Sequence, residues 1–412
     1  MPESPIHYSQ ASNSPPIPIE IVSEEEMALI EYALLAVKRS YFPSPIRISK
    51  SLSLSSSSSF NVNNVRSIES ISIHSKRRLS TCSQDVKVGD IEDLGDSVNS
   101  QKRIRKLDSL LHRFRKKRAL SVTDVVGSEW CQKQMEFVLL RGKPKATEAM
   151  KAGTERHAKL ESEVVQKINI RVKEIEDSWA LKLMTFIVGA NQLLFEGLTR
   201  ELPLIGYLEG VWMVGVIDEI RLPINESVQS PFLVENKTRS RDTLPAEAQK
   251  RNSKLQLMCY KYMWDNIVTS NFPASRFYTF FGLNSYYILS QEVQDLAAAS
   301  GFPANTLDDV VMYYRNTCAA LSPAHNELLI RYEFQGDHSL LGEEKFTYDS
   351  AWLMSQLRCS LEFWLGEQEA SYVSQDERWK CRFCKFASIC PNSYTESETK
   401  QAETELDTVS KT

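Results

Sequence analysis

Three stretches rich in Val, Ile, Leu and aromatic residues follow one another in the middle of the chain, and they constrain the fold more than any other feature. The stretches are Leu198 to Ile205, Tyr207 to Leu222 and Phe232 to Thr238. They are interrupted by Gly206, Gly210 and the proline-bounded segment 223–231. Runs of β-branched and aromatic residues bounded by turn residues predict strands joined by hairpins. We therefore expect a small sheet at the centre of the protein.

Helical patterns lie on both sides of this expected sheet. A helix capped by Ser121 or Thr123 is expected to carry Trp130 and Cys131. The other expected elements are a helical region from Glu148 to Phe195, helices from Pro245 to Thr269 and from Ser350 to Gly366, and strands near Phe277 to Leu283 and Glu327 to Phe334. Helices around a small sheet indicate an α/β or α+β fold of about 275 residues, and we expect α/β.

Net charge and composition indicate which parts of the chain can fold. The 412 residues include 49 Lys/Arg and 53 Asp/Glu, a net charge of −4 that excludes a uniformly basic nucleic-acid coat protein. Up to about residue 100, the Ser-, Pro- and Asn-rich composition cannot support a packed core. We expect a disordered, Ser-rich and basic arm at 1–119, a folded domain at 120–392 and an acidic disordered tail at 393–412.

The expected arm contains two basic segments. Residues 38–80 hold eight Lys/Arg and one acid among many serines, a composition typical of an organelle transit peptide. The first 37 residues hold six Glu and no Lys or Arg, so a translation start at Met27 would suit import better, which N-terminal sequencing of the mature protein tests. Residues 102–118 hold nine Lys/Arg and one acid, as in a solvated linker, a nuclear import signal or a nucleic-acid contact. We expect a mitochondrial location, with the nucleus as an alternative or additional site.

Two carboxylates and a lysine occur near the ends of the expected central strands. Asp218 ends the apolar run VWMVGVID, and Glu235 and Lys237 follow the apolar run FLV on the next strand. Residues two apart on a strand share a face, and a hairpin would bring Asp218 opposite Glu235. Hard carboxylate oxygens suit Mg²⁺ or Mn²⁺, which can polarise a phosphodiester and activate water. The alternative is a strand-end carboxylate that merely pairs with a nearby base, but unpaired charges are costly in such apolar surroundings.

Two helical positions accompany this set. Gln256 and Tyr260 are four residues apart on the helix after the strands, so they share a face that can either orient the lysine or contact the nucleic-acid backbone. His157 stands early in the long helical region, in the sequence Gly-Thr-Glu-Arg-His. Taken alone, a single helical histidine is more often structural than a metal ligand.

Three cysteines lie close together near the end of the expected domain. Cys381, Cys384 and Cys390 form a C-x2-C-x5-C pattern, which indicates a metal site that needs a fourth thiolate. Spacing does not choose between zinc and a [4Fe-4S] cluster. Nor does it select the fourth ligand among Cys82, Cys131, Cys259, Cys318 and Cys359.

In combination, these motifs resemble the exonuclease V family, a eukaryotic branch of the RecB-like nucleases in the PD-(D/E)xK superfamily. The resemblance extends from Leu120 to Pro391 and depends on motifs in a fixed order. They are LSVTDVVGSEWC, GTERH, VGVIDEI, ENKTR, EAQKRNSKLQLMCYKY and WKCRFCKFASIC. The resemblance implies a restriction-endonuclease-like core, in which helices flank a small central mixed sheet, with helical additions and an iron-sulfur staple.

The resemblance also implies roles for individual residues. It places Asp218, Glu235 and His157 at a catalytic Mg²⁺ or Mn²⁺ ion, with Lys237, Gln256 and Tyr260 completing the catalytic set. It implies Cys131 as the distant fourth ligand of a [4Fe-4S] cluster held with Cys381, Cys384 and Cys390. Basic residues just beyond the active strand are candidate DNA contacts, or else ordinary surface charge; these are Arg239, Arg241, Lys250, Arg251 and Lys254.

The sequence thus predicts a metal-dependent exonuclease that degrades single-stranded DNA from its ends, in DNA replication and repair or in organellar genome maintenance. A single-strand-binding protein is a candidate partner, the chain is expected to be a monomer, and no membrane span is expected. The competing interpretation is a non-catalytic nucleic-acid-binding module in which the cysteines hold structural zinc.

Overall fold

The computed structural model describes residues 77–82, 109–170, 172, 174–223, 230–269 and 272–392, which all belong to one compact unit, Arg66–Thr412. The expected transit-like segment apart from residues 77–80, the basic run up to residue 108 and the acidic tail at 393–412 lie outside the described residues. Within the described ranges, no helix combines the length and the apolar character needed to cross a membrane.

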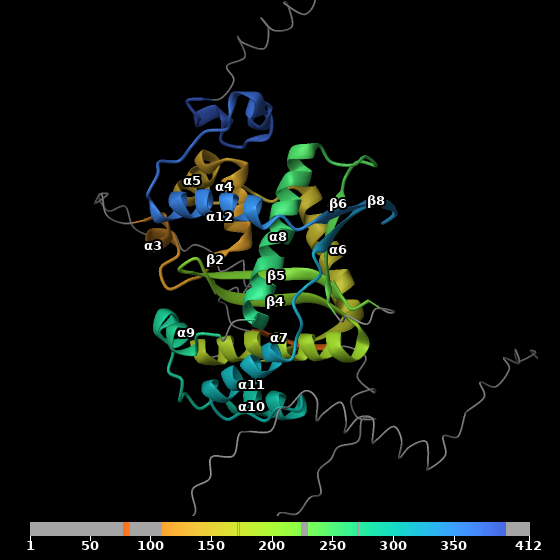
Figure 1. The fold of residues 1–412 in the computed structure, drawn as a ribbon, viewed down its shortest axis with the longest axis vertical. Coiled ribbons are helices and arrows are strands. Elements are labelled where there is room, and N and C mark those ends of the chain that lie inside the picture. The colour runs from red at the N-terminus through yellow and green to blue at the C-terminus, as the bar shows by residue number, and fades with distance from the viewer. Residues whose placement is uncertain are drawn as a thin grey trace, which may run out of the picture. The chain divides into compact units, whose positions relative to one another are not determined.

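A six-stranded mixed sheet forms the centre of the fold, with the order β2-β5-β6-β7-β8 and β4 on the other edge of β5 (Figure 1). β5 is antiparallel to β4 and β6, β6 is parallel to β7, and β7 is antiparallel to β8. A separate parallel pair joins β1 to β3. The strands are β1 Arg77–Cys82, β2 Leu120–Ser121, β3 Val165–Ile170, β4 Leu198–Leu208, β5 Val211–Arg221, β6 Phe232–Arg239, β7 Glu327–Phe334 and β8 Leu340–Thr347.

Helices flank this sheet. α7 packs along β4 and is itself covered by α10 and α11, while α8 crosses β4, β5 and β6 (Figure 1). The helices are α3 Leu110–Phe114, α4 Val122–Trp130, α5 Gln132–Arg141, α6 Glu148–Val164, α7 Ile175–Glu196, α8 Glu247–Thr269, α9 Ala274–Phe281, α10 Gln291–Ala299, α11 Leu307–Ala319 and α12 Ser350–Leu365. Two 3-10 helices, η1 Gln375–Phe383 and η2 Ala387–Ile389, end the described chain.

The structure confirms the α/β fold, the three central strands, the helices α8 and α12, and the strand β7. Ser121 caps α4 by accepting the backbone N–H of Asp124 at 3.0 Å, and the side chain of Asp124 reciprocates in a capping box. The folded part includes residues before the expected start at Leu120, because α3 packs on the core. Arg115, from the basic run, donates to both carboxylate oxygens of Asp124 at 2.8 and 3.0 Å. This arginine therefore stabilises the fold.

Three expectations about secondary structure are wrong. Gly206 does not end a strand, because β4 continues through it to a turn at Glu209 and Gly210, whose φ angles of 46° and 83° suit a two-residue hairpin. The helical region from Glu148 to Phe195 is interrupted by β3, whose sequence VQKINI contains β-branched residues that favour a strand.

The expected strand from Phe277 to Leu283 is instead mostly the helix α9. Phe277 and Phe281, four residues apart, are both buried on one face and pack against the ring of Trp212. Their spacing fits the helical period, whereas the aromatic composition of the segment misleadingly favours a strand. The strand β8 was not expected, because its sequence LLGEEKFT contains few apolar residues.

Gly215 allows α8 to lie directly on β5. A Cβ atom at this position would lie 2.5 Å from Cε1 of Tyr260 and 3.1 Å from Cγ2 of Val122. Both neighbours are buried, so neither can move away freely. The absence of a side chain at Gly215 therefore sets the distance between the central strand and the helix that carries Gln256 and Tyr260.

We predict that Gly215→Ala lowers the free energy of unfolding by about 1–3 kcal/mol, the usual cost of overpacking a core. Gly206→Ala in the adjacent strand is the matched control, because its Cβ would meet no atom closer than 3.6 Å. Urea unfolding of both variants and the wild type measures the difference. Equal stabilities of the two variants would contradict the prediction.

Candidate active site

Asp218 and Glu235 lie opposite each other at the junction of β5 and β6. Glu219 pairs with Val234 in this antiparallel ladder, and one further step in the same register places Asp218 opposite Glu235. The backbone N–H of Asn236 donates to Oδ2 of Asp218 at 2.8 Å. Both carboxylates are buried, with 8% of Asp218 and 1% of Glu235 exposed. The strand geometry therefore holds two acidic groups together where water solvates them poorly.

A chain of hydrogen bonds holds Lys237 beside these carboxylates. Lys237 shares a strand face with Glu235, and its Nζ lies 2.6 Å from Oε1 of Glu235. The same Nζ donates to Oε1 of Gln256 at 2.9 Å. Gln256 in turn donates from Nε2 to the hydroxyl of Tyr260 at 3.1 Å. The two α8 residues thus fix the position of the ammonium group.

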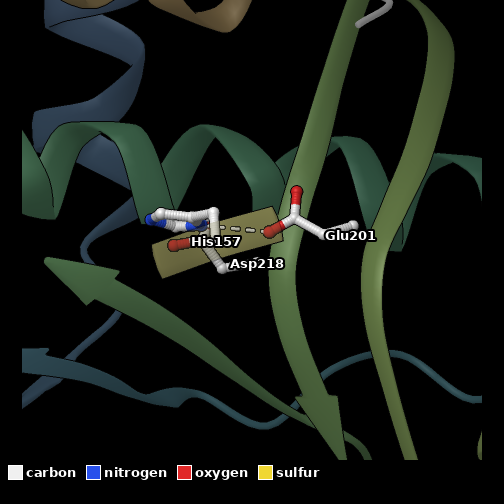
Figure 2. Close-up of side chains that lie close together, drawn as sticks. All are labelled: His157, Glu201 and Asp218. Atoms are coloured by element: carbon white, nitrogen blue, oxygen red, sulfur yellow. Dashed lines mark hydrogen bonds and ion pairs between the residues drawn. The ribbon is translucent and has the colours of Figure 1, made fainter. Parts of the chain in front are cut away.

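His157 reaches the same place from α6, and Figure 2 shows its ring next to the carboxylates of Glu201 and Asp218. Its Nδ1 lies 3.0 Å from Oε1 of Glu201 and 3.7 Å from Oδ1 of Asp218. Its Nε2 lies 3.1 Å from the carbonyl oxygen of Asn236. Burial lowers the pKa of His157, but the two carboxylates more than offset this effect and raise the pKa to about 10.

Glu201 is a site residue that the sequence analysis missed. It stands on β4 opposite Asp218, and the ladder between β4 and β5 skips this one pair. The backbone of Glu201 has a left-handed φ of 48°, which is uncommon for a residue other than glycine and is often found at functional sites. The signal in the sequence is an acid within an apolar strand, but its place opposite Asp218 follows only from the hairpin register.

An arginine cluster anchors α6, the helix that carries His157. Arg200 on β4 donates from Nε to Glu219 on β5 at 2.8 Å and from a guanidinium nitrogen to the carbonyl of Leu160 on α6 at 3.0 Å. It also contacts the carboxylate of Glu163 on the same helix. Next to His157, Arg156 pairs with Glu333 of β7 at 2.7 Å. These contacts fix the helix on the sheet and thereby position the imidazole.

The charges of this site fit a divalent cation. Burial and the nearby Asp218 raise the pKa of Glu235 to about 7, and burial raises the pKa of Asp218 to about 6. Oε2 of Glu235 is buried and has no hydrogen-bond partner among the described residues. One ligand atom from each of His157, Glu201 and Asp218 lies within 4.8 Å of the others. Crowded carboxylates with a spare oxygen are the donor set that Mg²⁺ or Mn²⁺ prefers.

The four predicted cluster cysteines line one pocket. Cys131 caps α5, where its sulfur accepts the backbone N–H of Gln134 at 3.4 Å, and Cys381, Cys384 and Cys390 come from the η1 and η2 region. Burial and the neighbouring thiols raise the pKa values of Cys381 and Cys384. Of the other candidates for a fourth ligand, Cys259, Cys318 and Cys359 do not line this pocket. The side chain of Cys82 lies outside the described residues.

The predicted DNA contacts are mostly engaged within the protein. Lys250 pairs with Glu247, Lys254 with Glu344, and Arg251 with both Glu129 and Glu377. Arg239 donates to the carbonyl of Thr243 and to Gln249. Arg241 is exposed in the loop after β6. Contact of these five residues with DNA remains a prediction.

The chain is similar in sequence to known proteins. The sequence model of the family described as "Exonuclease V - a 5' deoxyribonuclease" matches residues 109–231, 223–300 and 301–391. The chain is also 31% identical over 303 residues to exonuclease V of Danio rerio, covering 71% of this chain and 76% of the relative. The chain belongs to the exonuclease V family.

This membership confirms the resemblance inferred from the motifs, and it makes the protein a nuclease. The competing interpretation of a non-catalytic binding module is therefore wrong. The matches in this exonuclease V chain begin at residue 109, next to α3, and end just after Cys390. The family region thus contains both the carboxylate site and the four-cysteine pocket.

The raised carboxylate pKa values predict how the metal-free protein responds to pH. Between the ordinary carboxylate values and about pH 7, the folded protein holds protons at Asp218 and Glu235 that the unfolded chain has lost. Its free energy of unfolding should therefore fall as the pH rises through this window. Unfolding in EDTA across this range measures the effect, which should be smaller in Asp218→Asn. The same slope in both proteins would contradict the assignment.

A bound cation should reverse that loss of stability. Above pH 7, Mn²⁺ or Mg²⁺ at about 100 times its Kd is expected to raise the melting temperature by about 5–10 °C, through about 2.7 kcal/mol of binding linkage. The shift should be lost in Asp218→Asn. It should be kept in the control Glu343→Gln, because Glu343 belongs to a second Glu-x-Lys sequence, on β8. An equal shift in Asp218→Asn would show that the ion binds elsewhere.

Proposed function

We propose that the protein is a Mg²⁺-dependent exonuclease that degrades single-stranded DNA from the 5′ end. The observation that carries this proposal is the convergence of Asp218, Glu235 and Lys237, with a buried oxygen of Glu235 that has no hydrogen-bond partner in the part of the chain that the structure describes. The printed description of the family, a 5′ deoxyribonuclease, supports the direction. The proposed preference for single strands follows the resemblance noted in the sequence.

In the proposed mechanism, Asp218 and Glu235 hold the cation, with His157 and Glu201 at the same centre. The ion, when bound, supplies Lewis acidity toward the scissile phosphate and lowers the pKa of a bound water. Lys237 offers a fixed ammonium group, which can orient the attacking water and stabilise the negative charge that develops on the phosphate. Gln256 and Tyr260 keep the ammonium group in place through their hydrogen bonds.

Degradation of end-labelled single-stranded DNA by the purified protein, with Mg²⁺ or EDTA, tests this proposal. Asp218→Asn should abolish activity, and Gln256→Ala should lower it about 10- to 100-fold, the usual cost of removing a residue that orients a catalytic group. Glu343→Gln should remain active. Substrates blocked at the 5′ or the 3′ end test the direction. Undiminished cutting by Asp218→Asn would disprove the mechanism, and faster digestion of a duplex would disprove the strand preference.

We further propose that the four-cysteine pocket holds a [4Fe-4S] cluster and not zinc. Four thiols in one pocket can supply the ligands for either group, and the family resemblance favours iron and sulfide. Protein prepared without oxygen should show the broad visible absorption of a cluster and contain iron and acid-labile sulfide. Cys384→Ser should lose both, whereas Cys359→Ser, outside this pocket, should retain them. A colourless, active protein containing zinc would overturn this assignment.

A further inference from the structure

The region after α12 forms a small structure of its own, which we call the cysteine module and define as residues 375–392. Two of its aromatic rings pack against rings on α4 and α5. The ring of Phe386 lies 5.6 Å from that of Phe137, and the ring of Trp379 lies 6.1 Å from that of Trp130. The third, Phe383, stands between Cys381 and Cys384 and is 73% exposed.

Phe383 is exposed beside a second aromatic ring. Its ring makes an edge contact with Trp379, at 6.4 Å between centroids. It follows Cys381 by two residues and precedes Cys384 by one, and both of these cysteines line the four-cysteine pocket. Because the contact with Trp379 limits some of the ring's rotation, stacking on a flat ligand would cost less conformational entropy than for a ring without a neighbour.

Exposed basic residues flank Phe383 in the sequence. Arg382 and Lys385 are exposed on either side of Phe383, and neither takes part in an ion pair within the ranges that the structure describes. Lys380, in contrast, is buried, pairs with Glu377 at 2.6 Å and lies over the ring of Trp130. The stretch 378–392 contains no acid, although residues 120–412 as a whole carry a net charge of −9. An exposed aromatic residue with exposed basic residues next to it in the sequence is complementary to single-stranded nucleic acid, which offers a base and flanking phosphates.

The cysteine module is attached to the helix that serves the active site. Glu377 of the module pairs with Arg251 of α8 at 2.6 Å. Gln256, which accepts the hydrogen bond from Lys237, follows Arg251 by five residues, or about 7.5 Å along the helix. The module and Lys237 therefore contact the same helix, about one and a half turns apart and on different faces of it.

We infer that Phe383 stacks on a base of the DNA substrate outside the catalytic centre, while Arg382 and Lys385 contact the adjacent phosphates. The ligand class is a single-stranded polynucleotide, so this inference rests on the proposed function and adds a base-stacking site to it. The stacking would hold the strand on the module while its end lies at the carboxylates. Because every base has a flat face, the site would tolerate any sequence.

Equilibrium binding to two oligonucleotides of equal length, one normal and one abasic in every nucleotide, tests this inference. The titrations use the full-length Asp218→Asn protein, so that no DNA is cut, and binding is measured by fluorescence anisotropy. Phe383→Ala on that background should weaken binding to the normal strand about 5- to 100-fold, as expected when one stacked base is lost. Its affinity for the abasic strand should stay the same. Phe383→Tyr should preserve both affinities, because it keeps the ring.

Ile389→Ala is the matched control, because Ile389 is an exposed apolar residue of the same module. It should leave both affinities unchanged. Phe383→Leu, which keeps an apolar side chain but removes the ring, should behave as Phe383→Ala does, and metal content and melting temperature check that each variant folds. Equal weakening on both strands would reveal a general loss of structure and overturn the inference. Unchanged affinities would also overturn it and would indicate that this surface serves another ligand, such as a protein.

The outcomes for this site and for the proposed function can be told apart. Nuclease activity is measured on protein with intact carboxylates, whereas stacking is measured by binding alone. If the wild type degrades DNA but the Phe383 variants bind it normally, only the stacking site is disproved. If the wild type cuts no DNA, the proposed nuclease mechanism fails whatever the binding results show.

Discussion

Asp218 and Glu235 meet where β5 and β6 join, in a part of the sheet that water hardly reaches, and their mutual repulsion must be compensated there. The compensation comes from several directions. β6 supplies Lys237 and the backbone N–H of Asn236, and α6 supplies His157. Glu201 from β4 adds a further carboxylate and thereby increases the need for a cation. Burying these carboxylates costs more free energy than an apolar core would at this place, unless a positive ion balances their charge.

The elements around this charge centre are fitted closely to it. Gly215 lets α8 approach β5, and Gly153 lets α6 approach β6, where a Cβ would lie 3.1 Å from Oγ1 of Thr238. Arg200 then links β4, β5 and α6 through Glu219 and the carbonyl of Leu160. Small residues set the distances between elements and buried ion pairs fix their orientation, so catalytic geometry and fold stability depend on the same contacts.

Local periodicity predicted much of this arrangement. The apolar runs indicated the central strands, and the two-residue period placed Glu235 and Lys237 on one face, just as the four-residue spacing did for Gln256 and Tyr260. The position of Glu201 was not predictable, since it depends on a hairpin register and one left-handed residue. The pairing of Arg251 with Glu129 and Glu377 was missed because these residues are far apart in the sequence. In the case of Cys131, only the family resemblance singled it out from the other cysteines.

The four-cysteine pocket takes Cys131 from the start of the domain and its other three thiols from the end. During synthesis, the pocket can be completed only after residue 390 has left the ribosome, when the strands and helices that form the catalytic site have already emerged. A chain that terminates before Cys381 would contain all the catalytic side chains and one of the four thiols. Only a chain that extends to Cys390 has all four thiols of the pocket, so a metal group bound there would stabilise such a chain and not a shorter one.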